Sequence, residues 1–252
     1  MASLARQTVE YFHLVFLRGL VARGEDKALI ALKGGCNLRF FFSSIRYSED
    51  LDFDVVVMAK GKLKNKVERL LKSPLVTAPL LARQVVITDV TAPKQTDATQ
   101  RWKVGLEVKG SAAPLRTKIE FSRRDAIEGA AFEAVAPAVV APHGLTPMLA
   151  THYRVGAAIA QKIVALAGRP EPQARDVFDL NLLFARTGAT AIRWPAKARR
   201  SQAIENAMGI SFDDYSSQVV AYLDPEQAAP FESRDAWEQM QEAVVARLET
   251  AR

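Results

Sequence analysis

Cysteine is nearly absent: the chain of 252 residues holds only Cys36. A single cysteine excludes an internal disulfide and agrees with a reducing compartment, so we expect a cytoplasmic protein. Long apolar runs are also lacking, and the opening residues MASLARQTVEYF do not have the pattern of a secretory signal. These absences exclude a disulfide-rich secreted protein, and we expect no membrane partner.

The sequence contains no internal repeat and no low-complexity tract. About half of its residues are apolar (49%) and a quarter are charged (25%), which is typical of a globular protein with a substantial core. The formal net charge is +6, an excess that favours a polyanionic partner such as RNA. Each basic cluster taken alone is more often a solvated helix face than a binding site.

One stretch organises the chain. A short apolar run at residues 29–32 leads into Lys33, Gly34 and Gly35, and residues 36–46 then carry apolar side chains at spacings of three and four. This pattern predicts a strand, a glycine turn and a helix. Glycines before a helix permit a sharp turn and expose amide groups at the positive end of the helix dipole, where phosphate binds well. The turn is a candidate phosphate site.

An acidic pair, Asp50 and Asp52, opens the next predicted strand. Since side chains alternate along a strand, the two carboxylates share one face, while Leu51 and Phe53 point to the other. Two adjacent carboxylates repel unless a cation lies between them, and Mg²⁺ prefers hard oxygen ligands. Either feature alone has a simpler interpretation as a tight turn or a solvated rim. Together, and in this order, they indicate chemistry on a nucleotide.

A third carboxylate comes from the predicted strand at residues 115–121. Here Lys118 and Glu120 share one face of the strand, opposite Ile119 and Phe121. If this strand lies beside that of the acidic pair, Glu120 completes a three-carboxylate metal site. Otherwise Glu120 belongs to an exposed strand face.

The remaining pattern predicts an α+β fold: a mixed sheet with flanking helices, followed by a helical C-terminal domain. We expect the domains at 1–145 and 146–252, joined through the proline-rich residues 135–147. The other expected elements in the first part are a helix at 4–23, a basic helix at 62–71, and an antiparallel pair at 84–90 and 102–109 around a polar loop at 92–100. The second part is expected to contain helices at 149–167, 175–184, 197–207, 213–223 and 234–248.

With these landmarks in order, the chain resembles the AbiEii-type (MenA-like) nucleotidyltransferase toxins, a branch of the DNA polymerase β-like nucleotidyltransferase superfamily. The match is spread over about residues 28–185, and the opening motif is its most specific part. The matching residues are Lys33, Gly34, Gly35, Leu38, Arg39, Arg46, Ser48, Asp50, Leu51, Asp52, Phe53, Lys118, Ile119, Glu120, Lys162, Arg175, Asp176, Asp179 and Leu180.

The resemblance implies a nucleotidyltransferase that uses two Mg²⁺ ions to move a nucleoside monophosphate from an NTP to an acceptor, releasing pyrophosphate. Several relatives modify the 3′ end of tRNA and are paired with an antitoxin. By similarity, the metal ligands are Asp50, Asp52 and Glu120, and the catalytic set adds Lys162, Asp176 and Asp179. The implied nucleotide-binding set is Lys33, Gly34, Gly35, Arg46, Ser48, Lys118, Lys162 and Arg175.

Several roles stay open at this point. Glu120 is either a metal ligand or the base that takes the acceptor proton, and Ser48 either bonds a phosphate or closes a turn. Arg175, Asp176 and Asp179 are also spaced as a structural ion-pair face. Cys36 stands where the family commonly has a hydroxyl residue. The alternative functions are transfer to a small molecule or a protein hydroxyl, and a non-catalytic nucleotide- or RNA-binding module.

Overall fold

A computed structural model describes residues 2–22, 24, 26–111, 113–187 and 192–251. The chain divides into two compact units. The first comprises Met1–Ser43 and Tyr47–Tyr153, and the second comprises Ser44–Arg46 and Arg154–Arg252. The chain therefore leaves the first unit for three residues, returns, and leaves it again after Tyr153.

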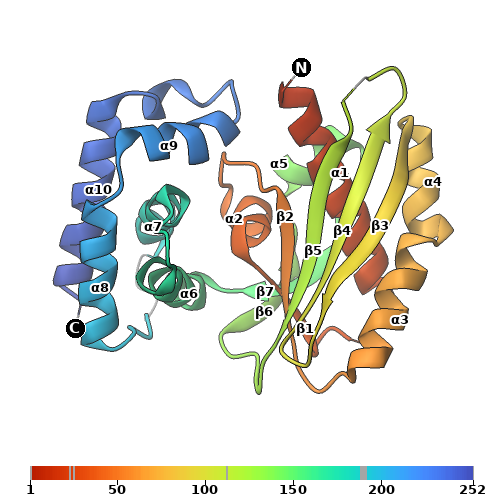
Figure 1. Cartoon of the computed structure of the whole chain (residues 1–252), viewed down its shortest axis with the longest axis horizontal. Helices are drawn as coiled ribbons and strands as arrows, with labels where there is room; N and C mark the ends of the chain where they lie inside the picture. Colours follow the sequence, from red (N-terminus) through yellow and green to blue (C-terminus); the bar gives the residue numbers. More distant parts are fainter. Residues whose placement is uncertain (1, 23, 25, 112, 188–191, 252) are drawn as a thin grey trace. The chain divides into compact units, whose positions relative to one another are not determined.

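A seven-stranded mixed sheet forms the centre of the first unit, in the order β3-β4-β5-β2-β1-β7-β6 (Figure 1). Strand β2 runs parallel to β5, and β1 runs parallel to β7, whereas the other neighbours are antiparallel. The expected mixed sheet is therefore confirmed. The strands are β1 (Ile30–Lys33), β2 (Asp50–Val55), β3 (Val85–Gln95), β4 (Thr99–Val108), β5 (Leu115–Arg123), β6 (Ala130–Ala134) and β7 (Leu149–Tyr153).

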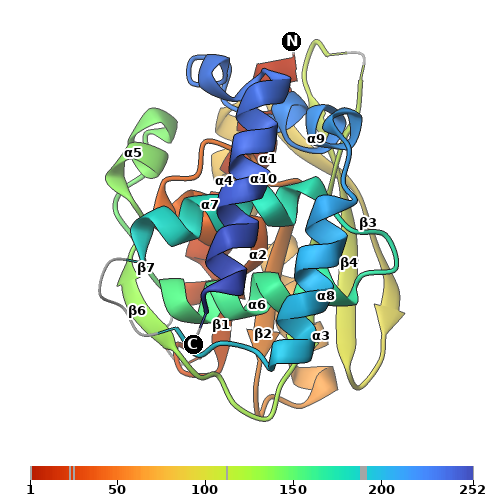
Figure 2. The same cartoon turned by 90° about the vertical axis from the view of Figure 1, so that its left-hand side faces the viewer.

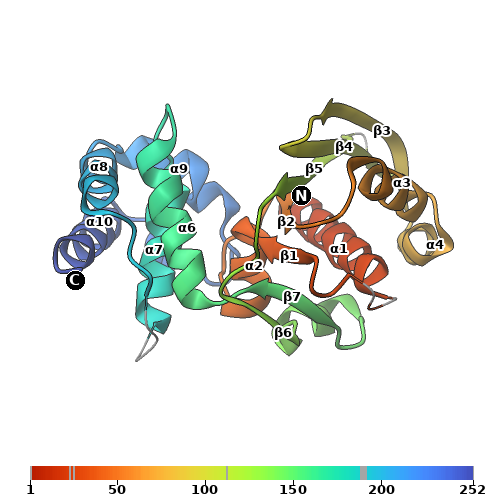
Figure 3. The ribbon, with the colours of Figure 1, turned by 90° about the horizontal axis from the view of Figure 1, so that it is seen from below.

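Helices cover one face of this sheet. Helices α1, α3 and α4 lie together on one side of the strands (Figure 3). Their apolar stripes pack on the sheet because the facing strand positions are apolar: Phe53 stacks on Phe121 at 4.8 Å, and Trp102 meets Phe121 edge-on. The helices of this unit are α1 (Ala2–Val21), α2 (Gly34–Phe42), α3 (Lys60–Leu71), α4 (Pro74–Ala82) and α5 (Pro137–Val140), followed by the 3₁₀ turn η1 (Ala141–His143).

The opposite face of the sheet is charged. Because paired residues on neighbouring strands point to the same side, the strand registers place one continuous set of polar side chains on this face. We call it the charged face. Its members from β1 to β3 include Lys33, Asp50, Asp52, Asp54, Lys118, Glu120, Arg101, Lys103, Thr91 and Lys94, together with Arg116 and Asp89.

Three expectations about the secondary structure are wrong. The helix expected at 149–167 begins only at Val155, because Leu149–Tyr153 forms β7 and completes the sheet beside β1. The loop expected at 92–100 is much shorter, since β3 continues to Gln95 through two register shifts and β4 starts at Thr99. The helix expected to continue to residue 46 ends at Phe42, because Ser43 takes up a left-handed conformation with a φ of +52°.

The second unit is helical. It contains α6 (Val155–Gly168), α7 (Ala174–Arg186), α8 (Lys197–Met208), α9 (Phe212–Gln218), α10 (Arg234–Glu249) and the 3₁₀ turns η2 (Val220–Tyr222) and η3 (Ala229–Phe231). Figure 2 shows α10 crossing α7 and running beside α8. Tyr215 stacks on the buried Trp237 at 4.6 Å and anchors α9 on α10. Across the described residues, the helices lack the combination of length and apolar character that crossing a bilayer requires.

The segment Ser44–Arg46 is built into this helical unit. Arg46 forms an isolated antiparallel bridge with Leu223, and the carbonyl of Ile45 accepts a hydrogen bond of 2.8 Å from the amide of Asp224. The segment thus adds a short extended piece to the end of η2.

Candidate active site

Strands β2 and β5 bring the predicted carboxylates together. In their parallel ladder, Asp52 lies opposite Glu120 and Asp50 lies opposite Lys118. The condition set by the sequence, that the two strands are neighbours, is therefore met. Beneath them, Leu51, Phe53, Ile119 and Phe121 are at most 1% exposed. This apolar layer fixes the strands, so the backbone positions of the three carboxylates are set by the core.

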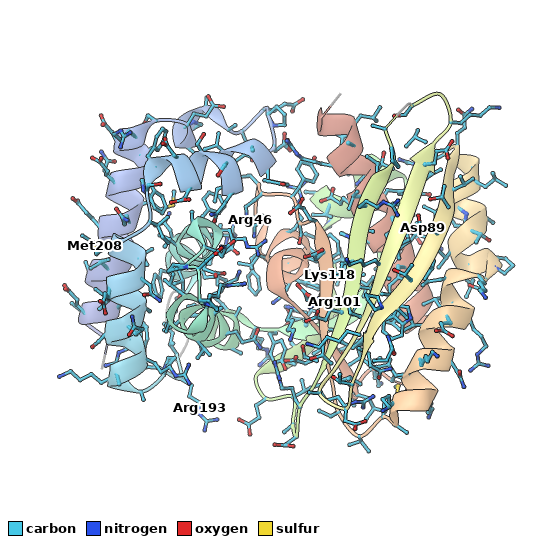
Figure 4. The ribbon with its side chains drawn as sticks, viewed as in Figure 1. Arg46, Asp89, Arg101, Lys118, Arg193 and Met208 are labelled. Atoms are coloured by element: carbon cyan, nitrogen blue, oxygen red, sulfur yellow. The ribbon has the colours of Figure 1, made fainter. Side chains whose placement is uncertain are left out.

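Two basic side chains pair with the outer carboxylates. Lys118 Nζ lies 2.7 Å from Asp50 Oδ2, and Arg101 Nε donates to Glu120 Oε2 at 2.6 Å. Figure 4 shows Arg101 and Lys118 on the neighbouring strands β4 and β5. All four of these side chains are between 18% and 34% exposed, so solvent and ligands can reach them.

Asp52 differs from its two neighbours. Burial, followed by the negative charge of Asp50, raises the pKa of Asp52 to about 6 from an ordinary value of 3.8. Lys33 and Lys118 oppose this shift, and Glu120 adds to it. The raised pKa of Asp52 therefore reflects its burial first and the nearby carboxylates second.

The glycine turn lies directly beside Asp52. Because β1 and β2 are antiparallel and Lys33 pairs with Asp52, the chain brings the start of α2 to the acidic strand. Gly34 has a φ of +69°, and a Cβ on it would lie 2.8 Å from Asp52 Oδ2. Only glycine satisfies both demands. Lys33 at the N-cap makes no side-chain cap, so the first amides of α2 remain available to a ligand.

Asp54 is a charged residue of this face that sequence analysis missed. Its carboxylate lies 2.6 Å from Lys33 Nζ and 3.3 Å from Arg124 Nε, and it accepts a hydrogen bond of 2.8 Å from the hydroxyl of Tyr153. Burial and Asp54 raise the pKa of Tyr153, so the hydroxyl stays protonated. The alternation that links Asp50 to Asp52 extends to Asp54 and is the signal that identifies it.

A buried polar network supports the acidic strand from below. His13 Nε2 lies 2.7 Å from Thr117 Oγ1, and Thr117 in turn donates to the carbonyl of Glu49 at 2.7 Å. Burial lowers the pKa of His13 to about 3, so its ring is neutral and acts as a structural hydrogen-bonding group.

The thiol of Cys36 belongs to the same network. Its Sγ donates to the carbonyl of Asp50 at 3.2 Å and lies 3.4 Å from His13 Nδ1. Ser48 Oγ donates to the same carbonyl at 2.9 Å, so in this structure it closes the turn before β2. These contacts hold the entry into the acidic strand in place.

The other predicted site residues lie in the second unit. Lys162 Nζ contacts Asp176 at 2.9 Å and Asp179 at 2.6 Å. Arg46 binds both oxygens of Asp179, at 3.1 and 3.0 Å, and Arg169 Nε lies 2.8 Å from Asp176. Both aspartates are fully buried. Asp179 therefore pairs with Arg46 and Lys162, and its ion pair expected with Arg175 is not among the described contacts.

Mutual attraction outweighs burial in this cluster. Burial alone would raise the pKa of Asp179, but Arg46 and Lys162 lower it below its ordinary value. Burial alone would likewise lower the pKa of Lys162, but Asp176 and Asp179 raise it. The ammonium of Lys162 and the carboxylate of Asp179 are therefore charged. Whether Lys162, Arg46 and Arg175 bind a triphosphate, as the resemblance implies, stays a prediction.

Within the described chain, no three His, Cys, Asp or Glu side chains are gathered as a metal-binding group; Asp50 and Glu120 pair with cations instead. The set formed by Asp50, Asp52 and Glu120 nevertheless consists of the hard oxygen donors that Mg²⁺ prefers, on adjacent positions of one face. Its donor chemistry fits a divalent cation, and a cation would relieve the repulsion felt by Asp52.

Comparisons with known proteins identify similar folds and one matching family. A search of curated proteins finds no match. The fold is similar to the crystal structure of JHP933 from Helicobacter pylori, with a TM-score of 0.57, 20% identity and coverage of 97% of this chain and 93% of that one. It is also similar to a candidate nucleotidyltransferase from H. pylori, with a TM-score of 0.58, 20% identity and coverage of 94% and 95%.

The profile of one protein family spans nearly the whole chain. The family is described as "Nucleotidyl transferase AbiEii toxin, Type IV TA system", and it matches residues 15–250. The match includes the glycine turn, the acidic strand, Glu120 and the helices that carry Lys162 and Asp179. The chain belongs to the AbiEii family, the nucleotidyltransferase toxins of type IV toxin–antitoxin systems.

Proposed function

We propose that this nucleotidyltransferase moves a nucleoside monophosphate from an NTP to an RNA, with the 3′ end of tRNA as the leading acceptor. The observation that carries the proposal is the ladder that places Asp52 opposite Glu120 and two positions from Asp50, on the same face. The net charge of +6 favours a polyanionic acceptor. The free, buried thiol of Cys36 agrees with action in the cytoplasm.

Asp50, Asp52 and Glu120 are the proposed Mg²⁺ ligands. When bound, a pair of such ions neutralises the charge that develops on the attacking and leaving oxygens of the transferred phosphoryl group. In the present structure, Lys118 and Arg101 neutralise two of the three carboxylates. To hold a metal, Asp50 and Glu120 would have to give up these ion pairs, and the ammonium of Lys118 and the guanidinium of Arg101 would then be free to pair with phosphate oxygens.

The glycine turn is proposed to hold the triphosphate. Gly34 lies against Asp52, and the uncapped amides at the start of α2 offer donors at the positive end of its dipole. Lys33 pairs with Asp54, so its ammonium is already fixed beside the turn. Ser48 and Lys118 complete the predicted nucleotide-binding residues of this unit.

In the proposed mechanism, the two aspartates of the second unit position basic side chains. Asp176 and Asp179 are fully buried and hold Lys162 and Arg46. We assign the two aspartates as positioning residues, which fix the two cations. Lys162, Arg46 and Arg175 remain the proposed triphosphate contacts of this unit.

A cognate antitoxin is the partner that the family implies. An antitoxin neutralises such an enzyme either by binding it or by modifying it, and co-purification of the tagged toxin with its genomic neighbour separates the two. A stable complex supports binding, whereas a mass change on the toxin without a complex supports modification.

The acceptor is tested by labelling. The purified protein is incubated with each α-labelled NTP, Mg²⁺ and total tRNA, and the RNA is resolved on a denaturing gel. We expect label in tRNA with at least one NTP, lost in EDTA and in the Asp50→Asn variant. A protein or small molecule labelled instead of RNA would reassign the acceptor, and nucleotide binding without any transfer would favour a non-catalytic module.

A further inference from the structure

Four cations form a compact cluster on the charged face, beside the carboxylates. Lys118 of β5 lies opposite Lys103 of β4, and Arg101 of β4 lies opposite Lys94 of β3. Arg101 and Lys103 are two positions apart on one strand, so all four side chains point to the same side. Neighbouring strands lie about 5 Å apart, which brings the four charges within reach of one another. We call these residues the cation cluster.

The cluster contains like charges in directly opposed positions, an arrangement that costs stability in a sheet. On its inner side, Lys118 and Arg101 are compensated by Asp50 and Glu120. On its outer side, Lys94 and Lys103 are exposed, and the described ion pairs give neither of them an acidic partner. An anion that lies across the outer pair would relieve this repulsion. The cluster therefore has the properties of an anion-binding surface.

The strand order fixes where this surface lies relative to the chemistry. The glycine turn follows β1, the carboxylates lie on β2 and β5, and the cluster extends over β5, β4 and β3. The glycine turn and the cation cluster are therefore on opposite flanks of the carboxylates. In phosphoryl transfer the attacking and leaving oxygens are roughly in line through the phosphorus. If the leaving pyrophosphate is at the glycine turn, the acceptor approaches from the cluster.

We infer that the phosphate backbone of the acceptor RNA crosses the outer part of this cluster, on Lys103 and Lys94, and reaches the carboxylates from the β3 edge of the sheet. This inference rests on the proposed function, because it takes RNA as the acceptor. Lys103 and Lys94 contact phosphates and take no part in the chemistry.

The side chains of the charged face also indicate how RNA is recognised. None of the described residues that β3, β4 and β5 direct to this side is aromatic; Trp102 and Phe121 point into the core. A surface without aromatic platforms offers bases nothing to stack on and binds the backbone through charge. Binding at the cluster is therefore tolerant of sequence and strongly dependent on salt.

The experiment combines two charge reversals, Lys94→Glu and Lys103→Glu, in one protein. The matched control is Lys62→Glu with Lys64→Glu, which makes the same charge change at exposed positions of α3, on the covered face of the sheet. Binding of fluorescent tRNA is measured at several salt concentrations with Asp50→Asn as the background, so that the RNA is not modified. Transfer kinetics are measured with Asp50 intact.

We expect the cluster variant to bind tRNA about tenfold or more weakly and its salt slope to fall by about 1 for each lysine. The KM for tRNA rises while the KM for NTP is unchanged and the thermal midpoint does not fall, because the reversals remove the repulsion across the strands. The α3 control stays close to wild type. The double replacement Lys94→Arg with Lys103→Arg retains binding.

Three results would overturn the inference. If the wild type labels tRNA and the cluster variant has the same KM and salt slope, the acceptor follows another path and the proposed function survives. If the KM for NTP rises instead, the cluster holds the triphosphate. If the wild type neither binds nor labels RNA, the proposed function and this inference fall together.

Discussion

Asp52 and Glu120 face each other across the parallel ladder of β2 and β5, although 68 residues separate them in the sequence. The pair is held by the apolar layer beneath it, where Phe53 stacks on Phe121. The site is therefore rigid in its backbone, while its net charge depends on what binds there.

The pH dependence of activity follows from Asp52. Its pKa of about 6 means that the carboxylate is lost as the pH falls through that value. Because a metal ligand has to be ionised, we expect kcat/KM to fall about tenfold per pH unit below pH 6 at subsaturating Mg²⁺. A profile measured from pH 5 to 8 tests this, and a profile flat down to pH 5 would contradict it.

The raised pKa of Asp52 should also affect the stability of the metal-free protein, with a pH dependence opposite to that of activity. The folded pKa of Asp52 is above the ordinary value of 3.8, so its contribution is fully present below that pH and is lost as the pH rises through about 6. Asp52→Asn should therefore raise the free energy of unfolding near neutral pH, by up to about 3 kcal/mol, with no gain below pH 4. Urea unfolding in EDTA at both pH values provides the measurement.

Lys118 competes with the metal for Asp50. Its ammonium lies 2.7 Å from Asp50 Oδ2, so Lys118→Gln removes a positive charge from the proposed metal site. We expect Mg²⁺ or Mn²⁺ to bind several-fold more tightly to this variant in the absence of nucleotide, as measured by calorimetry. Arg116→Gln is the matched control, because Arg116 is on the same strand and pairs with the more distant Asp89. Equal metal affinity in Lys118→Gln and wild type would show that the pair does not oppose metal binding.

A comparison of Gly34 with Gly110 distinguishes the effect of backbone strain from that of a steric clash. Both have a positive φ, +69° and +87°, but only at Gly34 would a Cβ meet a neighbour, at 2.8 Å from Asp52 Oδ2. Alanine at either position costs about 1–2 kcal/mol of stability. We expect only Gly34→Ala to lose activity, by at least about tenfold, because it displaces the carboxylate. Thermal melts and transfer assays on the two variants make the comparison.

Much of this site can be predicted from the sequence because it depends on local patterns. Alternation along a strand places Asp50 with Asp52 and Lys118 with Glu120, and the glycine pair marks the start of α2. What the sequence does not reveal is partnership across the sheet. Arg101 pairs with Glu120 only because β4 lies beside β5 in one particular register, and no local signal indicates that register.

In the second unit, the property that the sequence does not reveal is burial. The spacing of Asp176 and Asp179 correctly places them on one side of α7, but it favours an exposed charged face, whereas both are buried. Their partner Arg46 is 133 residues from Asp179 and lies in a segment that the sequence assigns to the end of a helix. Burial of this kind depends on tertiary packing, which periodicity does not encode.

The buried cluster should be costly to break. Asp179→Ala leaves Arg46 and Lys162 without a shared counter-ion, and removal of one partner from a buried ion pair costs about 3–5 kcal/mol. We expect the Arg46→Met/Asp179→Leu double variant to lose less stability than the sum of the two single variants. Chemical denaturation of all four proteins gives the coupling free energy, and simple additivity would contradict the assignment.

Because Ser44–Arg46 belongs to the second unit, that unit cannot be expressed as one continuous piece of the chain. A fragment that begins at Arg154 contains Asp179 but not Arg46, and it also lacks Ile45, whose carbonyl binds the amide of Asp224. We therefore expect the helical unit not to fold when it is expressed alone. During synthesis, Arg46 emerges from the ribosome long before its counter-ion Asp179 does. Splitting the gene at residue 153 should yield two pieces that regain a folded helical half only when they are mixed.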